Sequence, residues 1–171
     1  SIASVALMSS AAYSQTVGVG TTKGGFTNQA GQSLSKVVSQ NTKIQMRSQP
    51  FGGSSVYVPA MNAGKLEFAL VNELEAFYAV TGTGIYPGRK HPNLRVVSAT
   101  IPFRVATFAR KSSNIRTLKD LKGKRVPSGW ASQKIIIPLM NAQLANAGLT
   151  YDDVIKVPVA SVVKSANVFA E

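Results

Sequence analysis

The chain has 171 residues, of which 44% are hydrophobic and 15% charged, and its formal net charge is +12 from 19 basic and 7 acidic residues. This length and composition suit a globular chain with a sizeable core and argue against disorder. The absence of cysteine excludes disulfides and thiol catalysis. The positive charge favours anionic partners: small anions, nucleic acid or membrane surfaces.

The first fifteen residues, SIASVALMSSAAYSQ, differ from the rest of the chain. A short apolar run over 2–8 precedes small residues at 9–12, which is typical of the end of a secretory signal peptide. The run is too short for a membrane-spanning helix. We expect residues 1–12 to be a signal-peptide remnant and the mature product to be soluble in the periplasm. An N-terminal strand or buried helix is the alternative.

Residues 16–38 predict a strand, a glycine-rich loop and a helix. Val17 and Val19 alternate with glycines, the loop covers 20–25, and Thr27 or Asn28 is suited to cap the helix. Such a junction presents free N–H groups and the positive end of a helix to a carboxylate, sulfonate or phosphate. The alternative is a connecting turn that binds nothing.

The same order of elements occurs twice more. A strand over 42–47, a turn over 48–55 and a helix ending at Gly64 come first, followed by a strand over 66–71 and a helix that ends at Gly82. The expected apolar helix faces are Ala30, Leu34, Val37 and Val38, then Val56, Ala60 and Ala63, then Ala76, Phe77 and Val80. The pattern predicts an α/β fold, a doubly wound and mostly parallel sheet whose three turns share the ligand-binding carboxyl edge.

The second half of the chain predicts further strands and helices. After a polar loop over 82–93, strands are expected at 94–99 and 105–109, and a short charged helix at 117–123. Another strand, turn and helix follow, with the strand starting at Arg125 and the helix covering 135–147, and a last strand and helix cover 155–159 and the residues after Ser161. We expect a first domain over 13–110 and an incomplete second α/β domain over 111–171.

The segment 104–125 is strongly basic. Its cationic residues are Arg104, Arg110, Lys111, Arg116, Lys119, Lys122, Lys124 and Arg125, opposed only by Asp120. Base stacking requires interleaved aromatic residues, and only Phe108 lies among these charges. A solvated basic surface is therefore favoured, and no nucleic-acid partner is expected.

Catalytic machinery is hard to assemble from these residues. The single histidine, His91, precedes Pro92 in a loop and is expected to be solvated. Without cysteine or a second histidine no metal site is expected, and Glu73 and Glu75 would not share a helix face. The glycine-rich loops match neither the dinucleotide fingerprint nor the phosphate loop. We therefore expect that the protein is not an enzyme, and that it has no catalytic residues and no cofactor.

Three stretches carry a resemblance to a known family: GTTKGGFTNQAGQSLSKVV, SQPFGGSSVYVPAMNAGKLEFALVNELEAFYAVTG and SNIRTLKDLKGKRVPSG. In order and spacing they resemble the TAXI-type solute receptors of tripartite ATP-independent periplasmic (TRAP) transporters, over about residues 16–171. The resemblance implies a type II periplasmic-binding-protein fold whose two domains close over a small molecule and deliver it to an ion-driven TRAP permease. Members are nearly twice this length, which implies a truncated second lobe whose exposed edges favour self-association.

The resemblance also implies ligand-binding positions. These are Thr21, Thr22, Gly24, Gly25, Phe26 and Thr27 in the first loop, Gly52, Gly53 and Ser54 in the second, Asn72 after the third strand, and Ser128, Trp130 and Ser132 in the second domain. The second-domain positions match the family pattern less well. Turn or cap roles for Thr21, Thr22 and Ser54, and interdomain packing for Trp130, are the structural alternatives.

The family is associated with glutamate, glutamine and related small carboxylates, so the resemblance implies such a ligand. An ABC-type receptor for a sulfonate, a phosphonate or a thiamine-like precursor shares the fold and is the alternative within transport. Two further alternatives are the effector-binding domain of a transcription regulator and a basic nucleic-acid-binding domain. The latter predicts binding that weakens steeply with salt.

Overall fold

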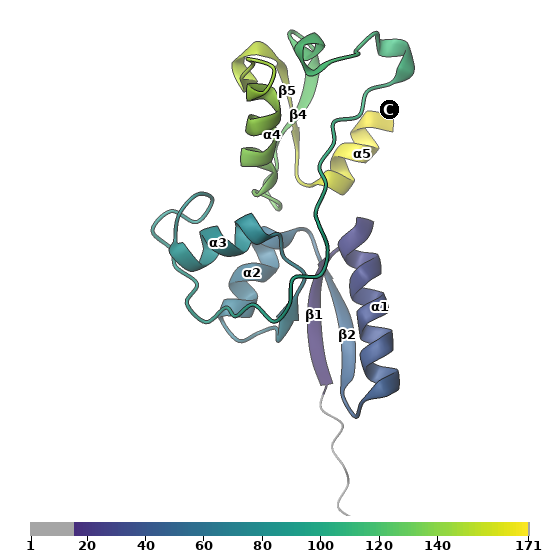
Figure 1. Cartoon of the computed structure of the whole chain (residues 1–171), viewed down its shortest axis with the longest axis vertical. Coiled ribbons are helices and arrows are strands. Elements are labelled where there is room, and N and C mark those ends of the chain that lie inside the picture. Colours follow the sequence, from purple (N-terminus) through teal and green to yellow (C-terminus); the bar gives the residue numbers. More distant parts are fainter. Residues whose placement is uncertain (1–15, 171) are drawn as a thin grey trace, which may run out of the picture.

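The computed structural model describes residues 16–170, so the expected signal segment lies outside the described residues (Figure 1). The strands are β1 (Thr16–Thr22), β2 (Gln45–Phe51), β3 (Phe68–Ala69), β4 (Arg125–Gly129) and β5 (Ile155–Val159). The α-helices are α1 (Gly25–Asn41), α2 (Ser54–Asn62), α3 (Glu73–Thr81), α4 (Ile136–Ala145) and α5 (Val162–Ala170), and short 3-10 turns are η1 (Lys111–Ser113), η2 (Leu118–Leu121) and η3 (Tyr151–Asp153).

The strands form two small parallel sheets. The first has the order β2-β1-β3, with Val19 opposite Ser48 on one side and Phe68 on the other. The second pairs β4 with β5, from Arg125 opposite Ile155 to Gly129 opposite Val159. Parallel pairing requires crossover helices, which α1, α2 and α4 supply. The predicted mixed α/β class with parallel strands is therefore confirmed.

The alternation of valine and glycine in β1 explains how helices pack on the first sheet. A Cβ built on Gly20 would lie 2.6 Å from Leu66 Cδ2 and 3.3 Å from the Tyr57 side chain, so this face needs glycine to receive them. On the other face, a Cβ at Gly31 of α1 would lie 2.3 Å from Thr21 Cγ2. Small residues thus let helices approach β1 closely from both faces.

The expected apolar faces of the first three helices are largely wrong. Gly31 and Ser35 are the buried residues of α1, Ser54, Tyr57 and Val58 those of α2, and Glu75 and Ala79 those of α3. The expected inward residues Leu34, Val37, Val56, Phe77 and Val80 are exposed. In α1 and α3 the buried positions are small or polar residues, whereas α2 buries the larger side chains of Tyr57 and Val58.

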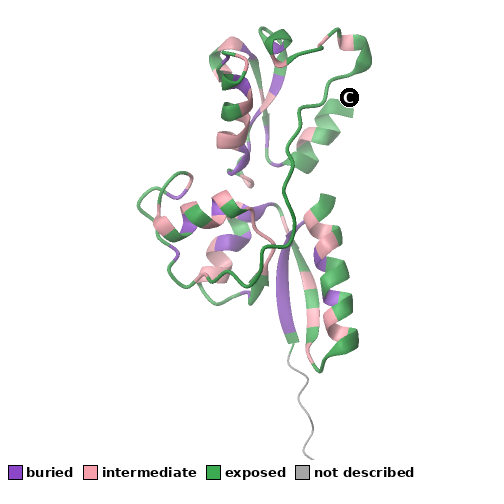
Figure 2. Ribbon diagram, viewed as in Figure 1, coloured by how far each residue is buried: buried purple, intermediate pink, exposed green. Residues whose placement is uncertain are grey.

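The strands expected at 94–99 and 105–109 are absent. Residues 94–110 form an extended connection without regular secondary structure, which runs from the loop after α3 to η1 (Figures 1 and 2). Its composition suits a strand, yet no described strand lies alongside to supply the ladder of hydrogen bonds. Large apolar side chains along it, including Val96 and Phe108, consequently stay exposed.

Other boundaries differ by a few residues. The second strand begins at Gln45 and extends to Phe51, and only Phe68 and Ala69 of the expected third strand pair with β1. The expected charged helix at 117–123 is the 3-10 turn η2. The strand at 155–159 and the left-handed glycine cap at Gly82 (φ 71°) are confirmed.

Three apolar clusters make up the core. One joins α2, β3 and α3 around Tyr57 and Val58, and a second lies under η2 and α4 around Leu144. The third joins the two halves of the molecule, because Trp130, Ile135 and Ile136 pack against Leu74 and Tyr78. Among the described helices, none combines the length and apolar character needed to cross a bilayer.

Candidate functional site

The loops at the carboxyl edge of the first sheet meet the loop between β4 and α4. The Ser132 hydroxyl lies 3.1 Å from the Gly52 carbonyl oxygen and 2.9 Å from that of Ala160, and can donate to either. The Lys134 backbone N–H donates to Ser55 Oγ at 3.0 Å. Parallel α/β sheets bind ligands at this edge, so the junction is where a ligand site is expected.

Gly53 allows the two loops to touch. A Cβ built on this residue would lie 2.0 Å from the Ser132 carbonyl oxygen, whereas one on Gly52 would lie 3.6 Å from Ser132 Cβ. The φ of Gly53 is 173°, an extended backbone that any residue adopts. The requirement for glycine at 53 is therefore one of packing and not of backbone conformation.

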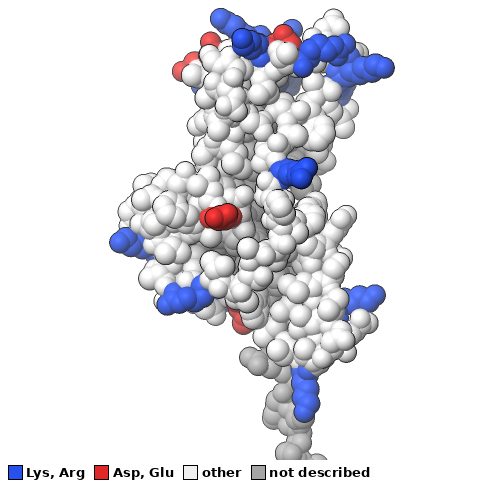
Figure 3. Space-filling view, viewed as in Figure 1, with Lys and Arg blue, Asp and Glu red and all other residues white. Residues whose placement is uncertain are grey.

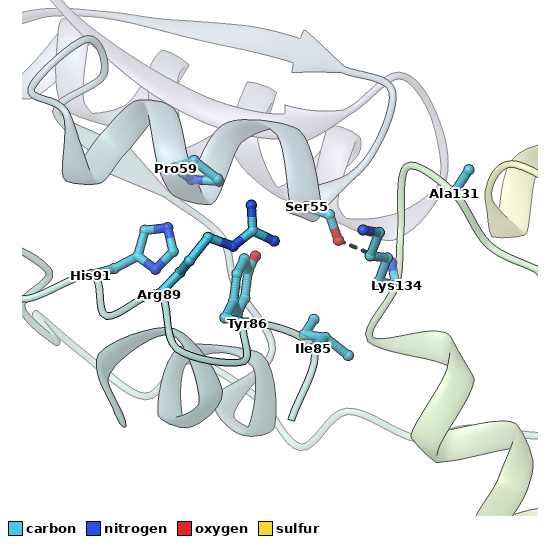
Figure 4. Close-up of a pocket in the computed structure, with 8 residues that line it drawn as sticks. All are labelled: Ser55, Pro59, Ile85, Tyr86, Arg89, His91, Ala131 and Lys134. Atoms are coloured by element: carbon cyan, nitrogen blue, oxygen red, sulfur yellow. Dashed lines mark hydrogen bonds between the residues drawn. The ribbon is translucent and has the colours of Figure 1, made fainter. Parts of the chain in front are cut away.

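A cavity of about 350 Å³ opens beside this contact. Figure 4 shows its walls coming from α2, from the loop after α3 and from the β4–α4 loop. The lining residues are Ser55, Pro59, Ile85, Tyr86, Arg89, His91, Ala131 and Lys134. The volume falls at the small end of the range for ligand pockets, and the wall is shared by segments far apart in the chain.

Two cationic side chains face this cavity. Arg89 comes from the loop after α3, and Figure 4 shows its guanidinium reaching between Pro59 and Tyr86. Lys134 comes from the opposite wall. Neither forms an ion pair within residues 16–170, where Lys156–Asp152 is the one salt bridge. The cavity is thus electrostatically suited to an anion.

His91 forms part of the cavity wall and is only 7% exposed, so the expectation of a solvated histidine is wrong. Its backbone N–H donates to the Ala79 carbonyl at 2.8 Å, which holds the residue against α3. Its ring packs edge-on against Tyr86, with the ring centroids 4.8 Å apart. The Nδ1 atom is buried and has no hydrogen-bond partner.

A buried carboxyl group lies behind the cavity wall. Glu75 is fully buried, and Tyr86 donates its hydroxyl proton to Glu75 Oε1 at 2.9 Å. Burial raises the pKa of the Glu75 carboxyl, and the neighbouring hydroxyls of Ser54, Tyr86 and Ser55 oppose that shift. Burial and the nearby Glu75 charge also raise the pKa of Tyr86. Glu73 is exposed, so the two glutamates lie on different faces of α3 as expected.

The first predicted loop is internally bonded. Thr22 Oγ1 lies 2.5 Å from Thr27 Oγ1 and 2.6 Å from the Gly24 carbonyl oxygen, and Thr21 Oγ1 lies 3.3 Å from Ser48 Oγ. The N-cap of α1 is Gly24, so the expected capping by Thr27 or Asn28 is wrong. Gly25 begins the helix with a φ of 73°, and Phe26 is 53% exposed. Val163 of α5 stands 3.5 Å from a Cβ built on Gly24.

The remaining predicted positions are buried or cap a helix, and the buried Ser54 Oγ has no hydrogen-bond partner among the described residues. Ser54 is buried and begins α2, while Asn72 Oδ1 accepts from Leu74 N at 2.9 Å and so caps α3. Ser128 lies buried within β4. Trp130 is 3% exposed in the cluster that joins the two sheets, where its Nε1 donates to Tyr151 at 3.4 Å. Among the predicted residues, Gly52, Gly53 and Ser132 are thus brought together.

The cavity residues Arg89, His91 and Lys134 were not predicted from the sequence. Arg89 and His91 belong to a loop rich in glycine and proline, whose only visible signal is its density of polar residues. Lys134 lies two residues beyond Ser132, the last position predicted for the second domain. Their proximity depends on how the two sheets pack, which no local pattern contains.

Within the described residues no cluster of histidine and carboxylate side chains could hold a metal ion. The NMT1-like family matches residues 18–170. This range includes both sheets, the junction between them and all the residues that line the cavity. Because the match spans most of the chain, the protein belongs to the NMT1-like family, a family of periplasmic solute-binding receptors.

Proposed function

We propose that this protein is a receptor that captures a small organic anion, glutamate, glutamine or a related carboxylate, in the cavity between α2, the loop after α3 and the β4–α4 loop. The observation that carries the proposal is the pair of cationic side chains, Arg89 and Lys134, on opposite walls without an acidic partner in residues 16–170. The receptor acts in the periplasm and delivers its ligand to a TRAP permease.

The chemistry of the wall supports a carboxylate. A guanidinium donates two parallel hydrogen bonds to a carboxylate, and an ammonium adds a second positive charge. Ile85, Pro59 and the Tyr86 ring offer apolar surface to the rest of the ligand. The volume of about 350 Å³ suits a molecule of amino-acid size better than a large cofactor.

In a more open form of the protein, the predicted glycine-rich loops would also line this site. We propose lobes over 13–110 and 111–171 that hinge apart, so that the contact of Ser132 with Gly52 and Gly53 opens. The N–H groups of the loop at Gly52 and Gly53 and the Ser54 hydroxyl then become available to the ligand, whereas Thr22 Oγ1 keeps its bonds within the first loop. Hinge closure of this kind is a common way for a binding protein to bury a small molecule.

An ABC-type receptor for a sulfonate, a phosphonate or a thiamine-like precursor is the second candidate. The NMT1-like family fits this reading as well, and two cations also suit a tetrahedral anion. The two hypotheses differ in the chemical class of the ligand and in the type of permease. A ligand screen separates them directly.

The test is a thermal-shift screen of carboxylates, amino acids, sulfonates and phosphonates, followed by calorimetry on any ligand found. A ligand present at about a hundredfold its Kd stabilises the fold by about 2.7 kcal/mol, which is a shift of several degrees. Arg89→Ala removes a charged hydrogen-bond donor worth about 1.5–3 kcal/mol, so Kd should rise about ten- to a hundredfold. Lys134→Ala should act in the same direction.

Lys90→Ala is the matched control, because it removes the same charge from the neighbouring exposed position, which does not line the cavity. Its Kd should change little. A carboxylate that binds the wild type, Arg89→Ala and Lys90→Ala equally would disprove this cavity as the site. Binding of sulfonates or phosphonates alone would favour the second candidate.

A further inference from the structure

A second surface with distinct chemistry lies away from the cavity. Figure 3 shows Lys and Arg gathered at the end of the molecule that carries η1, η2 and the start of β4. Eight cationic residues of the segment 104–125 are exposed, with Arg104 on the extended connection and the others from its end to the start of β4: Arg104, Arg110, Lys111, Arg116, Lys119, Lys122, Lys124 and Arg125. The cavity residues Arg89 and Lys134 are not among them.

Acidic groups do little to neutralise this surface. Asp120 is the single carboxylate of the segment, and it accepts backbone hydrogen bonds from Arg116 at 2.9 Å and Thr117 at 2.7 Å. These bonds lower the pKa of Asp120, so it stays ionised while it caps η2. Asp153 similarly accepts from the Thr150 backbone at 2.9 Å. The cations are therefore left facing solvent in excess.

Exposed apolar side chains lie in the same stretch of chain. Ile101, Phe103, Val105 and Phe108 are 51%, 52%, 41% and 80% exposed, on the extended connection that lacks a partner strand. Arg110 follows directly, with its guanidinium 5.5 Å from the Phe169 ring centroid. Arg104 and Arg110 thus lie beside these apolar residues, and the other cations follow over 111–125.

The same segment borders an apolar hollow. A cavity of about 560 Å³ lies between this connection, η2 and α4. Val105, Ile115, Leu118 and Leu121 contribute apolar wall, and Arg116 also lines it. The hollow thus combines apolar wall with a cation from the basic segment, an arrangement that suits an amphiphile with an anionic head.

We propose that the exposed segment from Ile101 to Arg125, here called the basic-apolar surface, docks on an anionic lipid bilayer. Lipid phosphates attract each cation near a charged membrane, and apolar side chains inserted beside them add hydrophobic binding. Phe103 and Phe108 offer rings on which nucleic-acid bases stack, whereas Ile101 and Val105 do not. An anionic bilayer interacts with both the cationic and the apolar side chains.

The docking surface uses residues separate from the anion cavity, so it stands or falls independently of the proposed ligand. Its consequence is that this surface by itself can hold the protein at a membrane. Binding through many weak charge contacts is reversible and falls with ionic strength. The protein would thus exchange between the bilayer surface and solution.

The test is co-sedimentation of the whole chain with phosphatidylcholine vesicles that contain about one third phosphatidylglycerol, compared with pure phosphatidylcholine vesicles, at low and high salt. The wild type should bind the anionic vesicles only, and less at high salt. The double variant Lys119→Gln/Lys122→Gln should lower the partition constant about thirtyfold, from the usual contribution of each lysine. Phe108→Ser should lower it severalfold at either salt concentration.

Lys36→Gln/Lys65→Gln is the control, because it removes two exposed charges from α1 and from the turn after α2, outside the basic-apolar surface. It should retain nearly all of the binding. All altered side chains are exposed, and circular dichroism would verify that each variant is folded. Absence of binding to anionic vesicles, or equal losses in the two double variants, would overturn the proposal. Salt-sensitive binding to duplex DNA or to RNA without vesicle binding would overturn it as well.

Discussion

Glu75 is a buried carboxyl group whose hydrogen bonding is incomplete. Its carboxyl is fully buried, one oxygen accepts from the Tyr86 hydroxyl, and the other oxygen has no hydrogen-bond partner. A buried ionised carboxylate without a cation is costly. The pKa of Glu75 is consequently raised, and the protonated form fits the fold better than the ionised form.

The raised pKa predicts how stability depends on pH. The folded chain binds the Glu75 proton more tightly than the unfolded chain, so the stabilisation is fully present below the unfolded pKa. It is lost as the pH rises through the folded pKa. Glu75→Gln keeps an oxygen that accepts from Tyr86 but cannot ionise. The free energy of unfolding of the wild type should therefore fall relative to that of Glu75→Gln as the pH rises from acid to neutral.

Urea unfolding of both proteins over that pH range measures the difference. The comparison is needed because Asp120 and Asp153 have lowered pKa values and push the pH dependence in the opposite direction in both proteins. Glu73→Gln is the control, because it makes the same chemical change at an exposed position of the same helix, and its pH curve should run parallel to that of the wild type. Parallel pH curves for wild type and Glu75→Gln would contradict the prediction.

At the scale of single elements, the cap of α3 supplies a clean test. Asn72 Oδ1 accepts from Leu74 N, which satisfies one of the free N–H groups of the helix. Asn72→Ala should lower the free energy of unfolding by about 1 kcal/mol, and Asn72→Asp should restore it, because aspartate caps equally well. Urea unfolding measures both changes.

The same pair of variants tests the predicted ligand contact. Asn72→Asp keeps the cap but adds a negative charge, so an anionic ligand should bind it more weakly if this side chain faces the ligand. Unchanged affinity in Asn72→Asp would show that Asn72 only caps the helix. Equal stability of wild type and Asn72→Ala would contradict the capping role itself.

Local patterns predicted the elements that depend on local interactions. The order of strands and helices, the strand at 155–159 and the glycine end of α3 follow from neighbouring residues. The buried faces of the helices could not be predicted in this way, because Gly31 and Ala79 are buried by close packing while Phe77 is exposed. The connection at 94–110 has strand-like composition, but pairing needs a neighbour that sequence periodicity cannot supply.

At the scale of the whole molecule, the site depends on the contact between the two sheets. The glycine loop at 52–53 was predicted as a ligand loop, and its approach to Ser132 brings Ser55 and Lys134 to one cavity. Arg89 and His91 reach this cavity from a loop with no recognised motif. Their role could not be predicted because it arises from packing between distant segments.

Trp130 is the only tryptophan of the chain, and it reports on this contact. It is 3% exposed and packs with Leu74 and Tyr78 across the junction. Its fluorescence should be shifted to the blue and poorly quenched by acrylamide in the folded protein. Gly53→Ala should increase quenching, because its Cβ would lie 2.0 Å from the Ser132 carbonyl and force the loops apart.

Gly52→Ala is the matched control, because its Cβ would meet Ser132 at an ordinary contact distance of 3.6 Å. Acrylamide quenching of Trp130 fluorescence in Gly52→Ala should equal that of the wild type. The far-ultraviolet circular dichroism should be unchanged in both variants. Equal quenching in the wild type and in Gly53→Ala would mean that the junction adjusts without opening. Increased quenching in Gly53→Ala alone would tie the burial of Trp130 to a contact that opens by movement of one half against the other, as a hinged receptor requires.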